Sequence, residues 1–491
     1  MSSDTIVAIA TATTPGAVGV VRVSGLGVRH VMAVVLSSDL TPRHASLRSF
    51  HDVSGEVVDQ GLAIFFPGPN SFTGEDVLEL QGHGGTAVLD RVLCACLSAQ
   101  CADWPIRLAE PGEFSKRAFL NDRLDLIQAE AVSDLVAARS HAAAKAALLS
   151  LQGGFSREVQ ALQSQLVDLR MRVEACLDFP DEEQEFLVRE AVAQRLTALS
   201  QAVDRVLLVS GRGVALRDGL RVVLVGPPNV GKSSLLNALA EQEVAIVTSV
   251  AGTTRDRIQH EIVIEGITVQ LTDTAGIRDS QDSVELLGID RTWQAVAQAD
   301  VLLMLRNASD TPAQGGGGGT TALEEAVRSA WLAGGGGPQD VWLIHNKADL
   351  LPAAAGSTPI EARHEKGVSG QVLEQTSGQT SGQVLEQTVG VQLWVSATTG
   401  LGLSGLRSHL RSRGGLMGQS ETVWGARRRH LDALEKTQSD ICLGQDHLRE
   451  SELELLAERL RLAQGHLSGL TGDFHSDDLL GVIFGSFCIG K

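Results

Sequence analysis

LRVVLVGPPNVGKSSLLNALA, residues 220–240, decides the fold of this chain. Its first six residues are typical of a buried strand, its middle is a glycine-containing loop, and its end is an amphipathic helix. Gly226, Gly231, Lys232 and Ser233 fit the pattern G-x-x-x-x-G-K-[ST]. In such a loop backbone N–H groups surround phosphates, the lysine reaches the β and γ oxygens, and the serine hydroxyl can ligate Mg²⁺. The stretch therefore predicts a nucleotide-binding α/β domain.

Three later motifs identify the nucleotide. DTAG, residues 273–276, ends the strand ITVQLT; its aspartate can hold Mg²⁺ through water and its glycine amide can meet a γ-phosphate. NKAD, residues 346–349, ends the apolar strand VWLIH, and Asp349 can accept hydrogen bonds from the N1–H and N2–H₂ groups of guanine. Adenine lacks this donor pair, so the motif selects GTP. SAT, residues 396–398, follows VQLWV and would contact guanine through backbone amides.

The segment TSVAGTTRD, residues 248–256, is the predicted switch. A threonine there can close over Mg²⁺ while the γ-phosphate is present, and Thr254 is the predicted ligand. Many small GTPases place a glutamine after the DTAG glycine, but this chain has Ile277. Asp279, Asp282 and Glu285 are the acidic alternatives for orienting the attacking water.

Taken together, these motifs predict the following nucleotide-binding residues: Asn229, Val230, Gly231, Lys232, Ser233, Ser234, Thr248, Ser249, Val250, Ala251, Gly252, Thr253, Thr254, Asp273, Thr274, Ala275, Gly276, Asn346, Lys347, Ala348, Asp349, Ser396, Ala397 and Thr398.

The 491 residues are too many for one small core, and the predicted secondary structure changes along the chain. Residues 1–118 alternate short strands with Gly/Pro turns, 119–217 are helical, 218–416 alternate strands and helices, and 417–491 are helical again. We expect the α/β block to be inserted into one helical domain. The segments 312–338 and 353–389, which contain glycine runs and the repeated octapeptide SGQVLEQT, are interpreted as surface insertions.

Composition predicts a cytoplasmic protein without a membrane segment. No run of 18 apolar residues occurs, and MSSDTIVAIA lacks the basic start of a secretory signal. Six cysteines in so long a chain do not indicate a disulfide framework. The net charge of −18 argues against broad nucleic-acid binding, although a local basic face is compatible with RNA contact.

Weaker signals leave alternatives open. The run Arg427–His430 is either an RNA contact or a solvated helix start. Cys94, Cys96 and Cys101 favour core packing over a metal site, because no fourth ligand is evident. In the terminal GSFCIGK, Cys488 is a lipidation site, a redox or catalytic nucleophile, or a packed residue, and C-I-G-K is a poor prenylation box.

The motifs together resemble one family, the MnmE/TrmE tRNA-modification GTPases. The similar stretches are GPPNVGKSSLLNAL, TSVAGTTRD, DTAGIRDSQDSVELLGIDR, GPNSFTGEDVLELQGHGG, PGEFSKRAFLNDRLDLIQAEA and the terminal FCIGK. The resemblance implies an N-terminal tetrahydrofolate-binding and dimerisation domain, then a helical domain interrupted by the G domain. It implies a homodimer that forms a heterotetramer with the FAD-containing protein MnmG (GidA).

The resemblance also implies roles for individual residues. K⁺ would lie beside the β–γ bridge, held by Asn229, Thr248, Val250 and Thr253, and Glu285 would orient the water. A 5-formyl-tetrahydrofolate-type cofactor would bind Arg22, Glu79, Arg123 and Lys491. Cys488 becomes a candidate for the uridine or folate chemistry. The implied reaction adds a carboxymethylaminomethyl or aminomethyl group to C5 of the wobble uridine (U34) of certain tRNAs.

One alternative function is a ribosome-assembly or regulatory switch GTPase that acts by binding alone. It shares the G domain, but it has no need for the N-terminal region or for FCIGK.

Overall fold

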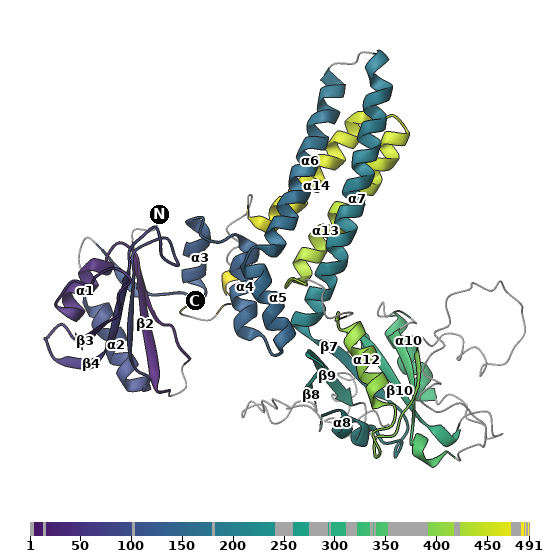
Figure 1. The fold of residues 1–491 in the computed structure, drawn as a ribbon, viewed down its shortest axis with the longest axis horizontal. Helices are drawn as coiled ribbons and strands as arrows, with labels where there is room; N and C mark the ends of the chain where they lie inside the picture. The colour runs from purple at the N-terminus through teal and green to yellow at the C-terminus, as the bar shows by residue number, and fades with distance from the viewer. Residues whose placement is uncertain are drawn as a thin grey trace, which may run out of the picture. The chain divides into compact units, whose positions relative to one another are not determined.

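The computed structural model describes residues 4–12, 16–100, 104–178, 182–240, 259–273, 293, 296–310, 322–333, 337, 340–351, 391–416, 423–472, 483–485, 487 and 490 (Figure 1). The chain divides into two compact units. Unit 1 contains Met1–Ala137, Ala147–Leu208 and Trp424–Lys491, and unit 2 contains Ala138–Ala146 and Val209–Val423. The predicted fold class, an α/β block inserted into a helical domain that follows an N-terminal α+β domain, is confirmed.

Unit 1 begins with a six-stranded sheet in the order β3-β4-β5-β2-β1-β6. Its strands are β1 (Thr5–Ile9), β2 (Val18–Ser24), β3 (Ser46–His51), β4 (Val57–Phe66), β5 (Val77–His83) and β6 (Ile106–Leu108). Neighbouring strands are antiparallel except β1 and β6. The helices α1 (Val28–Leu36) and α2 (Thr86–Ser98) share a buried core with the sheet.

Alternation along the strands separates this core from the polar positions. On β5, Leu78 and Leu80 are buried in the core, whereas Glu79 between them is half-buried. Successive strand residues point to opposite faces, so Glu79 and its register partner on β2, Arg22, lie on the face away from that core. The sheet therefore presents a charged pair on one face.

The helical part of unit 1 is built from segments before and after unit 2. Short helices α3 (Glu113–Leu120) and α4 (Leu126–Ala137) precede the long α6 (Gly154–Asp178) and α7 (Glu182–Asp218), and α13 (Arg428–Arg449) and α14 (Leu453–Thr471) follow (Figure 1). Gln438 of α13 donates to Ser200 of α7 at 2.8 Å. The helices that flank unit 2 in sequence therefore pack as one bundle, as predicted.

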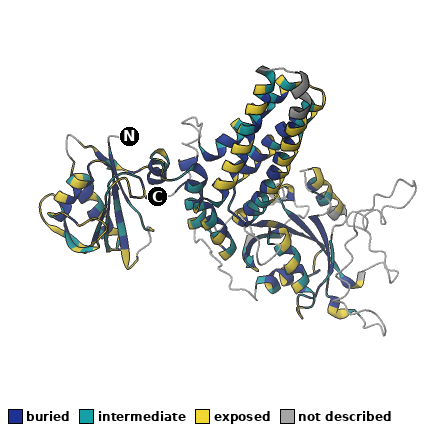
Figure 2. Cartoon of the chain, turned by 45° about the horizontal axis from the view of Figure 1, so that its top comes forward, coloured by how far each residue is buried: buried dark blue, intermediate teal, exposed yellow. Residues whose placement is uncertain are grey.

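In the sequence, Leu162, Leu166, Leu169, Val173 and Cys176 recur at 4-3-4-3 spacing before Phe179-Pro180, which predicts an apolar stripe on a helix that ends there. For α6 this prediction is largely confirmed. Leu162, Leu166, Leu169 and Val173 are buried, and the helix ends at Asp178, just before the Phe-Pro pair that was expected to stop it. Cys176, the last residue of the stripe, is only half-buried. Long helices of unit 1 accordingly show buried and exposed residues on different faces (Figure 2).

Unit 2 contains a second six-stranded sheet in the order β12-β11-β10-β7-β9-β8. Its strands are β7 (Leu220–Val225), β8 (Gln259–Ile264), β9 (Ile267–Asp273), β10 (Val301–Asn307), β11 (Val341–Asn346) and β12 (Val391–Trp394). All neighbours are parallel except β8 and β9. The helices described with it are α8 (Lys232–Ala240), α10 (Ala322–Ala333) and α12 (Leu403–Arg413), and α5 (His141–Leu151) begins in this unit.

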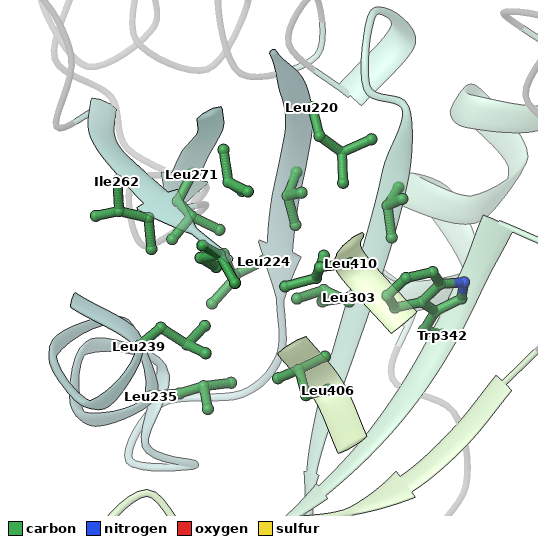
Figure 3. Packing of buried hydrophobic residues seen from close by; sticks show 14 of the residues in the cluster. Leu220, Leu224, Leu235, Leu239, Ile262, Leu271, Leu303, Trp342, Leu406 and Leu410 are labelled. Carbon is green, nitrogen blue, oxygen red and sulfur yellow. The ribbon is translucent and has the colours of Figure 1, made fainter. Parts of the chain in front are cut away.

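Leucines from two helices fill one face of this sheet. Leu235 and Leu239 of α8, and Leu406 and Leu410 of α12, pack against strand residues such as Leu224 (Figure 3). Burying a leucine side chain contributes roughly 1.5–3 kcal/mol. This packing fixes α8 and the loop before it against the carboxyl end of β7. No helix within the described ranges is long and apolar enough to span a bilayer.

Candidate functional site

The loop between β7 and α8 has the close packing that its glycines predict. A Cβ atom on Gly226 would lie 2.6 Å from the carbonyl oxygen of Leu305, so a side chain does not fit there. Gly231 has φ +97°, a conformation that only glycine adopts at little cost, and Asn229 has φ +63°. The loop therefore depends on its glycines, and it places backbone amides at the start of α8, where anions bind.

Lys232 already lies along this loop. Its ammonium donates to the carbonyl oxygens of Gly226 at 2.9 Å and Pro227 at 3.2 Å. Ser233 and Ser234, which follow it, are exposed at the first turn of the helix. The lysine side chain can exchange a carbonyl partner for a phosphate oxygen while its backbone stays in place.

Asn346 joins the loops of the predicted nucleotide site. It is 2% exposed, and its amide nitrogen donates to the carbonyl oxygen of Val230 at 2.8 Å. Its amide oxygen accepts from the backbone N–H of Ala397 at 3.2 Å. One buried side chain thus ties the end of β11 to the phosphate loop and to the SAT motif. The sequence predicted Asn346 as a site residue but did not predict this bridging role.

The rest of the NKAD motif is positioned around that residue. Lys347 has φ +62° and its ammonium donates to the carbonyl oxygen of Asn229 at 2.8 Å. Ala348 is buried and donates to the carbonyl oxygen of Val395 at 3.0 Å. Asp349, in the short 3₁₀ turn Ala348–Leu350, is exposed. Its carboxylate is therefore accessible to a base.

The SAT motif forms a tight turn beside the same asparagine. Ser396 is buried, and its hydroxyl accepts from the backbone N–H of Thr399 at 3.2 Å. Ala397 and Thr398 lie within that turn. The structure therefore brings together the predicted residues of the phosphate loop, NKAD and SAT.

Several predicted residues lie outside the described ranges, namely Thr248, Ser249, Val250, Ala251, Gly252, Thr253, Thr254, Thr274, Ala275, Gly276, Glu285, Cys488 and Lys491. Cys101 and the predicted insertion 353–389 lie outside them too. The prediction of a surface insertion is wrong for part of 312–338, because residues 322–333 form α10, whose Val327 and Trp331 are buried in a core cluster with residues of the sheet. Asp273 is the last residue of β9, and only its backbone is described.

On the N-terminal sheet, Arg22 and Glu79 form an ion pair. Arg22 contacts Oε1 of Glu79 through Nε at 3.0 Å and Nη2 at 2.9 Å. Its guanidinium lies 5.7 Å from the ring centroids of both Phe72 and Phe114, and Nη1 donates to the carbonyl oxygen of Gly490 at 3.3 Å. Within the described part of the chain, Oε2 of Glu79 forms no hydrogen bond or ion pair, so its hydrogen-bonding capacity is unused.

One loop connects this pair to Arg123. The loop 67–75 carries Phe72, which packs on Arg22, and Gly74, where an added Cβ would lie 3.3 Å from Cγ of Arg123. Asn121 donates to the carbonyl oxygen of Thr73 at 2.7 Å, which fixes the loop against the segment after α3. The three folate-binding residues predicted within the described ranges therefore lie around a single loop.

A buried arginine that the sequence analysis missed supports this loop. Arg117 donates to both carboxylate oxygens of Glu75 at 3.2 Å and to Oε1 of Glu113 at 3.0 Å. Arg107 and the backbone N–H of Glu110 also bind Glu113. Although burial raises the pKa of Glu113, these contacts outweigh it and lower that pKa. The i, i+4 spacing of Glu113 and Arg117 in PGEFSKR was the available signal.

A pocket of about 380 Å³ opens beside Arg123. It lies against the start of α4 and against α6, and the C-terminal residues of α14 close it. Its polar lining includes Asp122, Gln160, Gln163 and Thr471. Nε2 of Gln163 is buried and has no hydrogen-bond partner among the described residues.

Glu130 of α4 is the centre of a buried ionic cluster at the start of α13. Its side chain is 2% exposed, and Arg429 binds it through two hydrogen bonds of 2.7 Å. His430 donates from Nε2 to Glu130 at 2.8 Å, and its Nδ1 accepts from the backbone N–H of Arg427 at 3.0 Å. This pairing assigns a neutral ring with the proton on Nε2.

The pKa shifts agree with that assignment. Burial lowers the pKa of His430, and the opposing effect of Glu130 does not compensate. Burial raises the pKa of Glu130, but His430 and Arg429 outweigh it, so the carboxyl stays ionised. The sequence left two alternatives for the run Arg427–His430, an RNA contact and a solvated helix start. Both are wrong for Arg427, Arg429 and His430, because only Arg428 of this run is exposed. The missed signal was Glu130 and Asp134, four residues apart on an apolar helix.

Of the two cysteines of α2, Cys96 packs in the core as predicted, whereas the prediction is wrong for Cys94. Cys96 is fully buried, and burial raises the pKa of its thiol to about 12, so it does not supply a thiolate ligand. Cys94 on the same helix is exposed.

Comparison with known proteins places these sites in a family. A family model described as "MnmE helical domain" matches residues 126–488, and one described as "GTP-binding protein TrmE N-terminus" matches residues 5–123. A "tRNA modification GTPase MnmE" of Ralstonia nicotianae is 48% identical over 489 residues, covering 99% of this chain and 96% of the relative. Proteins of the same name from Bordetella parapertussis and Cupriavidus pinatubonensis are each 46% identical, covering 99% of this chain and 99% and 98% of theirs. The phosphate loop that Asn346 ties to the base-recognition motif, the sheet that carries Arg22 and Glu79, and these full-length matches lead to one conclusion: the chain belongs to the MnmE family.

Proposed function

We propose that this chain hydrolyses GTP and acts in tRNA modification. The observation that carries the proposal is the Asn346 bridge, which joins the phosphate loop, NKAD and SAT through one buried side chain. The family relatives carry the name tRNA modification GTPase. The separate charged cluster at Arg22 and Glu79 supports a second chemical site, which a pure switch GTPase does not need.

The site selects GTP through Asp349. Its exposed carboxylate accepts two hydrogen bonds from guanine, and adenine would leave it unmatched. Lys232 exchanges its carbonyl partners for the β and γ oxygens. Ser233 and Thr254 are the proposed Mg²⁺ ligands, and the hydroxyl of Ser233 is exposed where such an ion would lie.

K⁺ is proposed beside the β–γ bridge, held by Asn229, Thr248, Val250 and Thr253. Asn229 fits this role, because Lys347 occupies its backbone carbonyl while the side chain is exposed at the phosphate loop. When bound, Mg²⁺ and K⁺ supply positive charge that offsets the charge developing on phosphate oxygens.

Hydrolysis is an in-line attack by water. An oxygen–phosphorus bond forms at the γ-phosphate, the bond to the β–γ bridging oxygen breaks, and the water proton leaves with the released phosphate. Glu285 is proposed to orient the water, since Ile277 replaces the usual glutamine. We propose that hydrolysis depends on a homodimer in which two G domains meet across their nucleotides.

The N-terminal cluster is proposed to bind 5-formyl-tetrahydrofolate or a related folate. Glu79 fits a pterin, because its Oε2 is available to the amino-pyrimidine edge while Arg22 holds Oε1. Arg123 and Lys491 would bind carboxylates of the folate. With the FAD-containing MnmG, the chain would place a carboxymethylaminomethyl or aminomethyl group on C5 of U34, with Cys488 as a candidate participant. We propose the cytoplasm as the location.

The K⁺ assignment is tested by GTP turnover in KCl and in NaCl at equal ionic strength, with wild type and Glu285→Ala. The proposal expects turnover to be faster in KCl, and to be lost in Glu285→Ala in both salts while GTP binding persists. Equal wild-type rates in the two salts would remove K⁺ from the mechanism.

A further inference from the structure

The C-terminal end of the chain packs into its own unit 1. Ile483, Phe484 and Phe487 are buried together with Leu126 and Ala129 of α4. The backbone N–H of Phe487 donates to the carbonyl oxygen of Phe484 at 3.0 Å, and their rings lie 5.4 Å apart. This end of the chain is called the tail, defined by the described residues Ile483, Phe484, Gly485, Phe487 and Gly490.

Two glycines permit the tail to approach so closely. Gly112 has φ +68°, and an added Cβ would lie 2.5 Å from the carbonyl oxygen of Phe484 and 2.9 Å from Cβ of Phe487. Gly490 has φ +95°, and its added Cβ would lie 2.4 Å from the carbonyl oxygen of Ile9. The tail therefore touches the start of α3 and the end of β1 at positions where no side chain fits, and the carbonyl of Gly490 accepts from Arg22 of β2.

Arg427 contacts the tail from the other side. It comes four residues after Val423, the last residue that belongs to unit 2. Its guanidinium donates to Asp134 at 2.8 and 3.2 Å and to the carbonyl oxygen of Glu130 at 3.2 Å. Held by α4 in this way, it lies 6.0 Å from the ring centroid of Phe487. A cation above an aromatic ring is attracted to the ring, and the attraction is stronger when both groups are shielded from water.

We infer that Arg427 is a positioning residue for Arg22 and that it acts through the tail. Arg427 holds the ring of Phe487, Phe487 anchors the tail three residues before Gly490, and the carbonyl of Gly490 holds one nitrogen of the Arg22 guanidinium. The other two nitrogens of that guanidinium hold Glu79. The segment that follows unit 2 in the sequence is thereby connected to the ion pair of Arg22 and Glu79. The docking of the tail stands on these contacts, and only its effect on folate binding rests on the proposed function.

Hydrogen exchange in the full-length protein tests the docking. In Arg427→Gln, amide exchange in a peptide covering the tail, which includes the bonded N–H of Phe487, is expected to speed up about threefold to thirtyfold. Peptides from the middle of α6 and α14 should exchange as in wild type. Arg428→Gln is the matched control, because the neighbouring Arg428 is 70% exposed and pairs only with Asp432 among the described residues. Its tail should exchange as in wild type.

Phe487→Leu separates the tail contact from the ionic cluster. This variant keeps Asp134 and Glu130 paired with Arg427 but removes the ring, so its tail should exchange faster by a similar factor. The double variant should exchange no faster than the faster single variant, because both changes remove one contact. Unchanged tail exchange in Arg427→Gln, or an equal rise in the tail and in the α6 and α14 peptides, would overturn the docking.

The consequence for Arg22 is tested by titration with 5-formyl-tetrahydrofolate. Arg427→Gln and Phe487→Leu are expected to raise the Kd severalfold by the same factor, with Kd unchanged in Arg428→Gln. Faster tail exchange with unchanged Kd would overturn the role of Arg427 in positioning Arg22. If wild type itself did not bind the folate, the proposed folate site would fail, and exchange would still decide the docking.

Discussion

The side-chain nitrogen of Asn346 donates to the carbonyl oxygen of Val230 at 2.8 Å, so the strand that carries the base-recognition motif is bonded directly to the phosphate loop. Asn346 is buried, and its oxygen holds Ala397 of the third loop. The proposed recognition of the base and of the phosphates thus depends on one buried amide.

Asn346→Ala should therefore weaken GTP binding and destabilise unit 2 together. Removing a buried amide that makes two hydrogen bonds leaves Val230 and Ala397 without partners, at a cost of about 2–4 kcal/mol. Asn237→Ala, on the exposed side of α8, is the control and should change neither quantity. Chemical denaturation and nucleotide titration measure the two effects; wild-type values for Asn346→Ala would show that the bridge contributes nothing.

Asp349→Asn should change the preferred base. An amide keeps one acceptor oxygen but sets an NH₂ group against the N2–H₂ donor of guanine, whereas it can accept from N1–H and donate to the 2-oxo group of xanthine. GTP should therefore bind at least about 100-fold more weakly and XTP more tightly. Competition binding with GTP, XTP and ATP checks this. A variant that keeps its preference for GTP over XTP would remove Asp349 from base recognition.

Much of this architecture follows from sequence periodicity and glycine positions. Leu162, Leu166, Leu169 and Val173 predicted a helix that the structure confirms, because a stripe at 3.6-residue spacing must face a core. The glycines around 226–231 predicted a loop that wraps phosphates, and the backbone has that form. In both cases the controlling interactions are local in sequence.

Contacts between distant residues could not be predicted in the same way. Glu130 pairs with Arg429 and His430, which lie 299 and 300 residues later in the chain, so nothing local indicates the pairing. From the sequence, Arg427–His430 is a run of cations at a helix start. Only the fold shows that carboxylates of α4 pair with three of them. The contact between Arg22 and Gly490 is similarly remote.

Glu130→Gln should destabilise the helical part of unit 1 by about 3 kcal/mol, because Arg427 and Arg429 would stay half-buried without this buried counter-charge. Glu435→Gln, on the exposed side of α13, is the matched control and should be close to neutral. Urea denaturation followed by a probe in unit 1 measures the difference. Equal stability of the two variants would mean that the attraction within the cluster does no more than offset the cost of removing its charges from water.

The unfolding free energy of unit 2 should decrease as the pH is lowered from 6.5 towards 4, because of His345. Burial lowers its pKa to about 4, and its ring stacks on Trp394 with centroids 4.7 Å apart. The unfolded chain binds a proton near pH 6.5 and the folded chain does not, so the contribution is complete above that pH. It is lost as pH falls towards 4, by on the order of 3 kcal/mol.

His345→Phe keeps an aromatic ring against Trp394 and removes the titration. The difference in unfolding free energy between wild type and this variant isolates the effect, because all other groups titrate in both. It should change between pH 6.5 and pH 4 and be constant above 7. A difference independent of pH would show that the ring is accessible to protons in the folded state.

The most direct test of the central proposal, a GTPase that acts in tRNA modification, is nucleoside analysis of tRNA by mass spectrometry. Cells that lack the chain should lose the C5 substituent of the wobble uridine. The wild-type chain should restore it, and Lys232→Ala, which removes the phosphate-binding ammonium, should not. Wobble uridine that stays fully modified in cells without the chain would contradict the proposal.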